Sequence, residues 1–357
     1  MSKLVLAINP GSTSTKIALY NGKEQVFVKT LRHSAEEIAK YPRVIDQFEF
    51  RRNAILDALK ENNVELSSLS AIVGRGGLLK PISAGVYEVN DAMIKDLKSC
   101  EMGEHASNLG GIIADNLAKQ VNGCRAFIAD PVVVDELQDV ARITGHPLFP
   151  KKSIFHALNH RAIAKIYAEE VGKKYNELNL VIVHLGGGVS VAAHQHGRVI
   201  DVNNALNGEG PFSPERSGTL PAQQLADACF SGKYTPNEIK AMICGKGGVV
   251  AHLGTNSFYD VEMKVKEGDP KFTLISDAFA YNIVKAVGAM AAVLSGKVDA
   301  ILITGGIAYN KPMMAQIEDM VKFIAPVKIY PGEDEMGALA MNGLDVIEGR
   351  EVSKIYL

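Results

Sequence analysis

Residues 4–22 read LVLAINPGSTSTKIALYNG, and this stretch decides the fold. Two short apolar runs flank a turn of Gly, Ser and Thr that ends in Lys16, and Asn21-Gly22 follows the second run. The pattern predicts a strand, a polar turn, a second strand and a tight hairpin, for which Asn-Gly is a strong signal. Backbone N–H groups, hydroxyls and one positive charge meet at the polar turn, and these groups bind polyphosphates. An ordinary hairpin with a polar tip is the competing interpretation.

The same layout occurs again in the second half of the chain. Residues 180–197 read LVIVHLGGGVSVAAHQHG, and placing Gly11 on Gly186 brings Gly22 onto Gly197. A weaker pair links 71–77, AIVGRGG, with 300–306, AILITGG, since each is an apolar strand that ends in two glycines. Two matching units in register predict a duplicated α/β domain with a glycine turn on each side of a cleft.

Composition limits the classes of function. The 357 residues suit two domains, and 47% hydrophobic with 22% charged residues is enough to form sizeable cores. A net charge of -2 argues against nucleic acid or an anionic membrane as the main partner. The four cysteines show no CxxC spacing, which favours free thiols in a reducing compartment. No signal peptide or membrane-spanning run is evident, so we expect a cytoplasmic protein.

The glycine turns are the candidate nucleotide-binding segments. The sequence contains neither a GxxxxGK[ST] loop nor a GxGxxG fingerprint, so any ATP would be held by the paired turns instead. The glycines of the second turn let backbone approach a phosphate closely. Two further glycines precede an expected helix, whose N-terminus would favour an anion. The candidates are Asn9, Ser12, Ser14 and Lys16 in the first turn, Gly186, Gly187 and Gly188 in the second, and Gly305 and Gly306.

Several charged and imidazole side chains are candidates for chemistry. Arg75 and Arg216 lie in glycine or proline loops at segment ends, where α/β proteins form ligand sites, although surface ion pairs are the usual role of such arginines. His156 and His160 are four residues apart on one helix face, a spacing that suits zinc, but no third ligand is evident, so a catalytic or structural imidazole is favoured. Glu335 stands in a short acidic run that a helix first turn would also explain.

These segments together resemble the acetate kinase family of the acetate and sugar kinase, Hsp70 and actin superfamily. The segments that carry the resemblance are spread over the whole chain. Where acetate kinases read Asn-Gly after His-Leu-Gly, this chain has Gly187-Gly188, which favours the butyrate branch of the family. The matching segments are residues 9–16, 73–77, 155–160, 184–188, 215–218, 303–307 and 333–335.

The resemblance implies a role for each candidate residue. Catalytic roles fall on Arg75, which orients a substrate carboxylate, Asp130, which lines the transfer site, His156, which hydrogen-bonds the phosphoryl group, and Arg216, which stabilises it. The other implied sites are ATP or ADP at Ser12, Ser14, Lys16, His184, Gly186, Gly187, Gly188, Gly305 and Gly306, Mg²⁺ at Asn9 and Glu335, and substrate at Arg75, Gly77, His105 and Phe155. His105 and His184 are as readily explained as structural histidines, and a structural role for His160 is also left open. Acetate kinases usually carry Val where this chain has Gly77, so we expect Gly77 to leave room for a longer alkyl chain.

The resemblance also implies the architecture and the reaction. We expect two duplicated actin/RNase H-like domains around a nucleotide cleft: residues 1–145, onto which a C-terminal helix at about 342–357 packs back, and the nucleotide-binding residues 146–341. The implied reaction is reversible transfer of the ATP γ-phosphoryl group to butyrate or another short-chain or branched fatty acid, in a homodimer or higher homo-oligomer. The alternatives are a sugar or polyol kinase of the same superfamily and a non-enzymatic actin-like or Hsp70-like nucleotide switch.

Overall fold

The computed structural model describes residues 3–357 and divides the chain into two compact units. Unit 1 comprises the residues through Val134 together with Asp334–Leu357, and unit 2 comprises Asp135–Glu333. The first unit is therefore built from both ends of the chain. The sequence led us to expect limits near residues 145 and 341, and the Pro-broken segment 145–152 lies inside unit 2. None of the helices formed by residues 3–357 combines the length and hydrophobicity of a transmembrane span.

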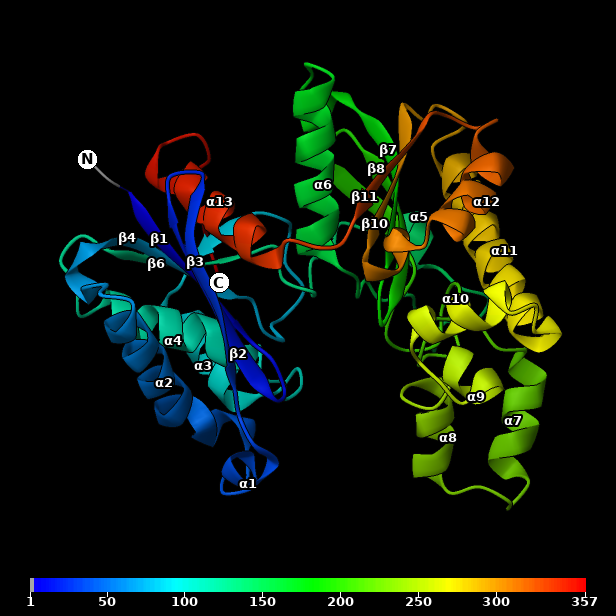
Figure 1. The fold of residues 1–357 in the computed structure, drawn as a ribbon, viewed down its shortest axis with the longest axis horizontal. Coiled ribbons are helices and arrows are strands. Elements are labelled where there is room, and N and C mark those ends of the chain that lie inside the picture. Colours follow the sequence, from blue (N-terminus) through cyan, green and yellow to red (C-terminus); the bar gives the residue numbers. More distant parts are fainter. Residues whose placement is uncertain (1–2) are drawn as a thin grey trace. The chain divides into compact units, whose positions relative to one another are not determined.

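Unit 1 is a seven-stranded mixed sheet with helices on both faces (Figure 1). The strand order is β12-β5-β6-β4-β1-β2-β3. Helix α13 packs on β1 and β4, and α4 packs on the opposite face of β4 (Figure 1). The strands are β1 (Leu4–Pro10), β2 (Ser14–Asn21), β3 (Glu24–Arg32), β4 (Leu69–Arg75), β5 (Val86–Glu88), β6 (Arg125–Ala129) and β12 (Lys354–Ile355). The helices are α1 (Ala35–Ile38), η1 (Val44–Gln47), α2 (Phe48–Glu61), η2 (Leu66–Ser68), α3 (Asp91–Ser99), α4 (Asn108–Ala118) and α13 (Glu335–Ile347).

Unit 2 is a five-stranded sheet of order β11-β10-β7-β8-β9. Helix α6 covers one face, and α11 and α12 cover the other (Figure 1). The strands are β7 (Asn179–Leu185), β8 (Val189–Gln195), β9 (Arg198–Val202), β10 (Ala300–Gly305) and β11 (Val327–Pro331). The helices are α5 (Asp139–Arg142), α6 (Ala157–Glu170), η3 (Tyr175–Glu177), α7 (Ala222–Phe230), α8 (Pro236–Ile243), α9 (Val249–Leu253), α10 (Phe258–Lys266), α11 (Pro270–Val293), η4 (Gly306–Tyr309) and α12 (Lys311–Val321).

The two sheets share one topology, as the repeated glycine turns predicted. In unit 1, β1 pairs antiparallel with β2 and parallel with β4, and β4 pairs parallel with β6. In unit 2, β7 pairs antiparallel with β8 and parallel with β10, and β10 pairs parallel with β11. Alternate side chains of β7 face the two helical layers, because successive residues of a strand point to opposite faces. The predicted tight hairpin forms between β2 and β3, and its loop is Gly22-Lys23, because Asn21 is still paired with Glu24.

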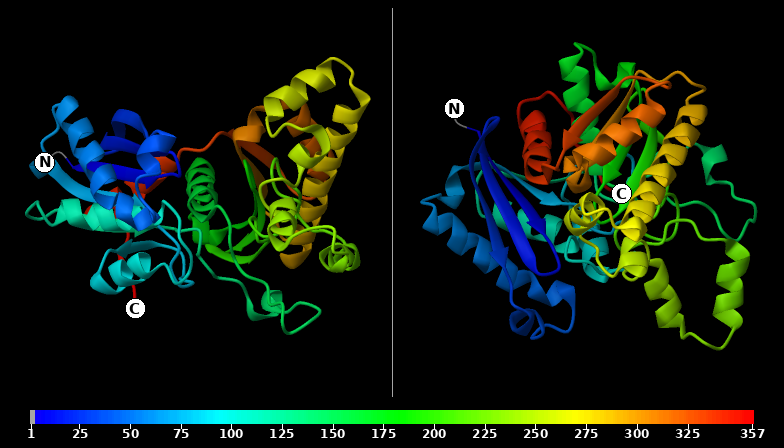
Figure 2. Two further views of the ribbon diagram at one scale, coloured as in Figure 1. Left: turned by 90° about the horizontal axis from the view of Figure 1, so that it is seen from below. Right: turned by 45° about the vertical axis from the view of Figure 1, so that its right-hand side comes forward.

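The last segment of the chain completes unit 1. Helix α13 begins at Glu335, with the Asp334 carboxylate capping it by accepting a hydrogen bond from the N–H of Gly337. Its apolar residues, among them Leu339 and Leu344, are buried. Figure 2 shows α13 and the following C-terminal segment on the same unit as β1. The final strand, β12, then pairs with β5 at the sheet edge.

Candidate active site

The first glycine turn joins β1 to β2 in unit 1. The N–H of Gly11 donates to the carbonyl of Ser14 at 2.8 Å and closes the turn. Asn9 pairs directly with Lys16 across the two strands, so their side chains lie on the same face of the sheet. Ser12 and Lys16 are exposed and Ser14 is half-buried. The four candidates of the first turn are therefore gathered at one end of one hairpin.

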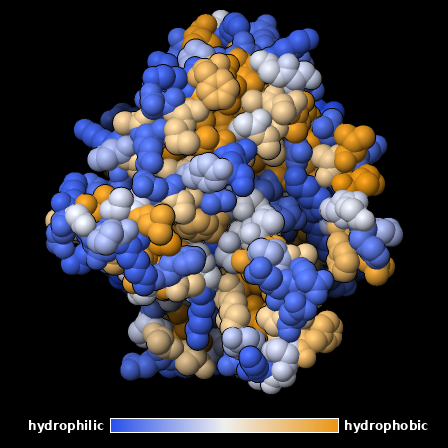
Figure 3. All heavy atoms as spheres, turned by 90° about the vertical axis from the view of Figure 1, so that its right-hand side faces the viewer, coloured by the Kyte–Doolittle hydropathy of each residue, from blue (hydrophilic) through white to orange (hydrophobic). Residues whose placement is uncertain are grey.

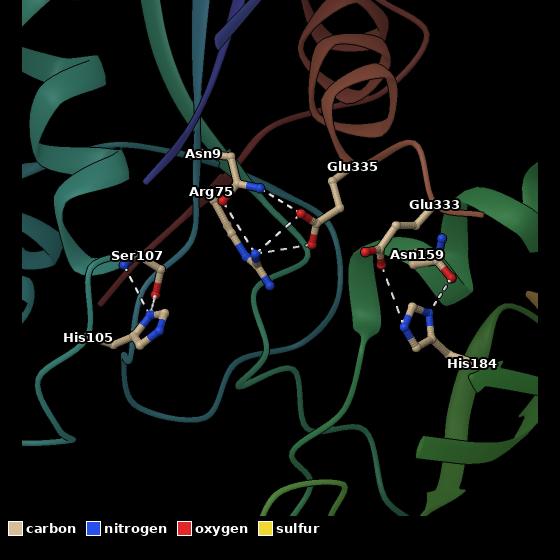
Figure 4. Close-up of polar contacts among 8 residues, drawn as sticks. All are labelled: Asn9, Arg75, His105, Ser107, Asn159, His184, Glu333 and Glu335. Atoms are coloured by element: carbon tan, nitrogen blue, oxygen red, sulfur yellow. Dashed lines mark hydrogen bonds and ion pairs between the residues drawn. The ribbon is translucent and has the colours of Figure 1, made fainter. Parts of the chain in front are cut away.

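Asn9, Arg75 and Glu335 meet beside this turn, although they lie far apart in the sequence (Figure 4). The Asn9 amide donates to Glu335 Oε2 at 2.6 Å. Arg75 Nη1 lies 3.1 Å from Glu335 Oε1 and 3.3 Å from Asn9 Oδ1. Arg75 ends β4, and Glu335 opens α13, so the carboxyl end of a central strand and a helix N-terminus supply the cluster. An amide, a carboxylate and a guanidinium are thus combined at one point.

The oxygen atoms of this cluster fit Mg²⁺. Mg²⁺ prefers carboxylate and carbonyl oxygen atoms, takes few of them from the protein and keeps several waters. Asn9 and Glu335 offer such atoms, and Arg75 Nη1 lies against both residues. No cluster of three or more His, Cys, Asp or Glu side chains suited to a metal occurs within residues 3–357.

Asp130 follows β6 in a conformation that side-chain-bearing residues rarely adopt. Its φ is +38°, in the left-handed region, and the residue is 2% exposed. Its Oδ1 accepts the Gly85 N–H at 2.7 Å, while its own N–H donates to the Gly85 carbonyl at 3.1 Å. Strained residues at strand ends cluster at functional sites. The carboxylate therefore also has a structural role, which is to secure the segment before β5.

His105 precedes α4 and has a defined ring orientation. Its Nδ1 accepts the Ser107 N–H at 3.1 Å and lies 2.8 Å from the Ser107 hydroxyl (Figure 4). Because Nδ1 is the acceptor, the neutral ring carries its proton on Nε2. Partial burial, followed by the positive charges of Arg75 and Arg51, lowers the pKa of His105. His105 is therefore a neutral hydrogen-bond donor at physiological pH.

The structure does not support the room that we expected beside Gly77. A Cβ on Gly77 would lie 2.5 Å from Asn108 Cα and 2.8 Å from Leu97 Cδ2. The space that the glycine leaves is therefore already filled by the start of α4 and by α3. Gly77 does not have a positive φ either. Its missing side chain is explained by the close approach of α4, and not by a pocket for an alkyl chain.

Arg51 is a residue that we did not identify from the sequence. It lies on α2, is fully buried, and its Nη1 donates to the carbonyls of Gly11 at 2.8 Å and Ser14 at 3.0 Å. The side chain of Gln47 also accepts from its guanidinium, and within residues 3–357 none of the hydrogen-bond partners of Arg51 is a carboxylate. Burial lowers its pKa to about 10, which leaves it charged at neutral pH. Its position on the apolar face of α2, four residues before the buried Ile55, was the available signal.

In unit 2, two imidazoles are stacked where α6 meets β7. His156 is the residue just before α6 and His184 lies near the end of β7, with ring centroids 3.8 Å apart and planes inclined by 15°. His184 Nδ1 lies 2.8 Å from Asn159 Oδ1, so this nitrogen carries a proton (Figure 4). Its Nε2 lies 3.6 Å from a Glu333 carboxylate oxygen. His156 is half-buried, whereas His184 is 2% exposed.

The second glycine turn lies against Arg216. The turn closes through the Gly186 N–H and the Gly188 carbonyl at 3.0 Å. A Cβ on Gly188 would lie 2.0 Å from Arg216 Nη1, so only glycine admits the guanidinium at this position. Arg216 Nη1 donates to the Ala205 carbonyl at 2.6 Å, and the Ser213 hydroxyl donates to the Gly187 carbonyl at 2.8 Å. The structure thus brings the second turn and Arg216 together.

Gly305 ends β10 beside the same turn. A Cβ on Gly305 would lie 2.3 Å from the Leu185 carbonyl oxygen, so these two strand ends are in close contact. Gly306 is exposed and begins η4, a single 3-10 turn, while α12 begins only at Lys311. The expected helix N-terminus at Gly305-Gly306 is therefore one short turn, and the argument from a helix dipole does not apply there.

Phe155 and His160 lie deeper in unit 2. Phe155 is 2% exposed and its ring meets that of His160 edge-on, with centroids 5.3 Å apart. His160 is fully buried and hydrogen-bonds to Ser190 and His194, two residues that our sequence interpretation did not include. Among the described residues, His156 and His160 share the Ser190 hydroxyl as a partner and do not form a zinc site.

Comparison with known proteins places this geometry in a family. The acetokinase family model matches residues 150–340, which is more than half of the chain. The chain belongs to the acetokinase family. Butyrate kinase 1 of Clostridium acetobutylicum is 59% identical to this chain over 352 residues, which are 99% of each chain. A probable butyrate kinase of Bacteroides thetaiotaomicron is 54% identical, again over 99% of both chains.

Solved structures of the family have the same fold. The acetate kinase of Porphyromonas gingivalis matches with a TM-score of 0.80 at 20% identity, over 97% of this chain and 100% of that one. A propionate kinase of Francisella tularensis matches with a TM-score of 0.74 at 18% identity, over 95% and 98%. These comparisons confirm the predicted family and the predicted duplicated α/β fold.

Proposed function

We propose that this chain catalyses the reversible transfer of the ATP γ-phosphoryl group to butyrate, which forms butyryl phosphate and ADP. The observation that carries the proposal is the full-length similarity, at 54–59% identity, to proteins named butyrate kinases or probable butyrate kinases. The groups of the candidate site suit such a reaction, because they are mainly cationic or hydrogen-bond donors.

A carboxylate acceptor sets the electrostatic requirement of the site. With a pKa near ~4, butyrate is already ionised at neutral pH and needs no general base. The difficulty is the approach of an anion to a polyanion, which fixed positive charges and N–H donors reduce. A sugar kinase would instead need a carboxylate to remove a hydroxyl proton. We assign Asp130 to positioning, since its Oδ1 is engaged by the Gly85 N–H.

Within unit 1, we assign ion and acceptor binding to the cluster beside the first turn. Asn9 and Glu335 would hold Mg²⁺, and the ion would supply positive charge to the transferred phosphoryl group. Arg75 would then turn from Glu335 towards the butyrate carboxylate, with which its guanidinium can form two parallel hydrogen bonds. The phosphate oxygen atoms would contact Ser12, Ser14 and Lys16. Arg51 fixes the conformation of this turn through its hydrogen bonds to the turn's carbonyls.

Within unit 2, we assign nucleotide binding to the glycine turn and to the end of β10. Gly186, Gly187 and Gly188 would present backbone to the phosphates, with Gly305 and Gly306 beside them. Arg216, held against Gly188, and an N–H of His156 would donate to the transferring group as charge shifts onto its oxygen atoms. His184, whose Nδ1–H donates to Asn159, would hold the His156 ring by stacking on it beside the nucleotide. We place His105 and the buried Phe155 in supporting roles, orienting neighbouring groups.

A hydroxamate assay tests the proposal. Purified protein, ATP, MgCl₂ and hydroxylamine, which displaces phosphate from an acyl phosphate, are incubated with acetate, propionate, butyrate or isobutyrate. Glucose and glycerol are tested in a coupled ADP assay. We expect acyl hydroxamate with butyrate, at a kcat/KM above that for acetate. ADP formation only with a sugar or polyol would favour the sugar kinase alternative. Slow ATP hydrolysis that no acceptor stimulates would favour a nucleotide switch.

The proposal extends to assembly and compartment. We propose a homodimer or higher homo-oligomer that works in the cytoplasm on small molecules, without nucleic acid or membrane partners. Figure 3 views the side of unit 2 that carries α11, where hydrophobic side chains are interspersed with hydrophilic ones. On α11, the large side chains of Leu274 and Tyr281 are 67% and 55% exposed. Light scattering after gel filtration measures the oligomeric state.

A further inference from the structure

A continuous row of hydrogen bonds runs through the interior of unit 2 and ends on His156. Tyr175 Oη lies 2.6 Å from His194 Nδ1, and His194 Nε2 lies 3.2 Å from His160 Nδ1. His160 Nε2 lies 2.8 Å from Ser190 Oγ, which in turn lies 2.9 Å from His156 Nδ1. We call these five residues the histidine wire. His160, Ser190 and His194 are fully buried, so water does not compete for these bonds.

The elements explain why the five groups align. His156 and His160 are four residues apart at the start of α6, where such a spacing puts side chains on one face. Ser190 and His194 are four apart on β8, where even spacings also share a face. Tyr175 begins η3, which follows α6 and precedes β7.

The wire permits only two proton arrangements when its imidazoles are neutral. A neutral imidazole has one N–H and one acceptor nitrogen, and both ring nitrogens of His160 and of His194 are engaged. Each ring must therefore accept on one side and donate on the other. The Ser190 hydroxyl is buried and the His156 and His160 rings are its hydrogen-bond partners, so its single hydrogen lies in one of these two bonds. If one bond is reversed, all four are therefore reversed. Burial, followed by nearby imidazole or guanidinium groups, lowers the pKa of both rings, to about 3 for His194, so both are neutral at physiological pH.

The Tyr175 end selects the direction. A phenol is a better donor than an imidazole N–H, and an imidazole nitrogen is a better acceptor than a phenol oxygen, so Tyr175 donates to His194 Nδ1. The Arg161 guanidinium lies 5.4 Å from the centre of the Tyr175 ring. A positive charge at this end favours the same direction, because it repels the positive ends of the O–H and N–H dipoles.

From this direction, the proton positions follow one after another. His194 and His160 each carry their proton on Nε2, and His160 donates to Ser190 Oγ. The Ser190 hydroxyl proton then points to His156 Nδ1, which leaves the proton of His156 on Nε2. We propose that Tyr175, His194 and His160 are positioning residues that hold His156, through Ser190, as its Nε2–H tautomer. The opposite tautomer would turn a lone pair, in place of an N–H, towards any anion at Nε2.

The catalytic consequence rests on the proposed function. An N–H on Nε2 of His156 can donate to an oxygen of the transferring phosphoryl group, where negative charge is concentrated. A lone pair there would repel the same oxygen. The wire therefore prepares the donor before substrates bind, which is preorganisation of the kind that raises kcat more than it lowers KM.

Histidine-selective ¹⁵N labelling tests the wire without any activity measurement. Long-range ¹H–¹⁵N spectra at pH 8 distinguish the two neutral tautomers, and spectra of His156→Gln, His160→Gln and His194→Gln assign the signals. We expect His156, His160 and His194 all to be Nε2–H tautomers. A neutral Nδ1–H tautomer for any of the three, or a doubly protonated buried ring, overturns the proposal.

Substitutions at the far end of the wire provide the second test. Tyr175→Phe removes the first donor and should convert His156 to a mixture of tautomers, as should His194→Leu. We expect kcat to fall by about three- to tenfold, the worth of one neutral hydrogen bond, while KM for ATP and butyrate stays nearly constant. In His194→Gln, the amide oxygen can accept from Tyr175 and its N–H can donate to His160, so it should restore most of kcat.

Tyr330→Phe is the matched control. Tyr330 packs against the same small apolar cluster beneath α6 as Tyr175, and its hydroxyl donates to Glu170 at 2.7 Å, outside the wire. Its replacement should leave the His156 spectrum and kcat unchanged. An unchanged His156 spectrum in Tyr175→Phe would refute the wire even if kcat fell. Three Nε2–H tautomers in a chain without kinase activity would refute the proposed function and leave the wire in place.

Discussion

Replacing Gly77 by valine should destabilise the protein and leave its choice of acid unchanged. Were Gly77 the floor of an alkyl pocket, valine would select against butyrate. Each methylene in an apolar pocket is worth about 1–3 kcal/mol of discrimination, so two would change the butyrate to acetate ratio by about a hundredfold or more. The structure instead places backbone where the new side chain would be, with Asn108 Cα 2.5 Å from the Cβ position.

The cost follows from the neighbours of Gly77. Carbon atoms in contact normally lie about 3.5–4.0 Å apart, so the start of α4 must move by roughly 1 Å, an overpacking that costs about 1–3 kcal/mol. The Asn108 side chain, 2.6 Å from the Cβ position, accepts the Leu78 N–H at 2.9 Å and donates to the Gly103 carbonyl at 3.0 Å. Loss of one such partner costs about 1–3 kcal/mol more. We therefore expect a total of about 2–6 kcal/mol, or a Tm lower by roughly 5–20 °C.

The assay combines calorimetry with kcat/KM for butyrate and for acetate, in wild type, Gly77→Ala and Gly77→Val. Gly145→Val is the control, because Gly145 lies in a loop with no atom within 4 Å of its Cβ position and has no positive φ. We expect both substrates to lose activity in parallel with stability. A wild-type Tm together with a ratio shifted about a hundredfold towards acetate would refute this reasoning and restore the pocket.

Three further predictions concern other parts of the site. Arg51→Met should lower the free energy of unfolding in urea by about 3–5 kcal/mol and raise KM for ATP, because the carbonyls of the first turn lose a charged donor. The control Arg52→Met should change neither the unfolding free energy nor KM, and equal effects of the two substitutions would contradict the prediction. Glu335→Gln should raise the Mg²⁺ concentration for half-maximal rate at least about tenfold, and an unchanged Mg²⁺ titration would exclude Glu335 as a ligand. Because burial lowers the pKa of His160 and His194, the unfolded chain binds protons that the folded chain does not as the pH falls below 6.5. Stability that is present above this pH should therefore be lost towards pH 4. His194→Leu should reduce the slope of the unfolding free energy against pH by about 1.4 kcal/mol per pH unit. Identical slopes for wild type and His194→Leu would argue against a buried neutral His194.

The sheets were predictable because their signals are local. The sequence match that places Gly11 on Gly186 corresponds to two sheets with the same strand pairing. It could be recognised because the alternation of a strand and the glycines of a turn are set by a few neighbouring residues. The grouping of Asn9 with Lys16 followed from the same hairpin. The resemblance to the acetate kinase family was also readable, because its segments are distributed along the whole chain.

The side-chain networks were not predictable, because they depend on contacts between distant segments. Arg51 reaches the first turn across about forty residues, and nothing in its local sequence names the carbonyls that it binds. Ser190 and His194 resemble ordinary residues of a buried strand until α6 is packed against them. At Gly77, the missing side chain suggested an open space, but the start of α4 fills that space, which the local sequence does not show.

The construction of unit 1 from both ends of the chain has a consequence for biosynthesis. A ribosome releases β1, β2 and β4 first, yet the helix that covers one face of these strands is encoded in the last 24 residues, Asp334–Leu357. Until those residues emerge, the apolar side chains of β1 and β4 on that face have no cover, and Glu335 cannot reach Asn9 or Arg75. Unit 2 is one continuous segment and can fold while translation continues. The unit that is begun first is therefore completed after unit 2, and a nascent chain has neither Glu335 beside Asn9 nor a complete first unit until residues 334–357 have emerged.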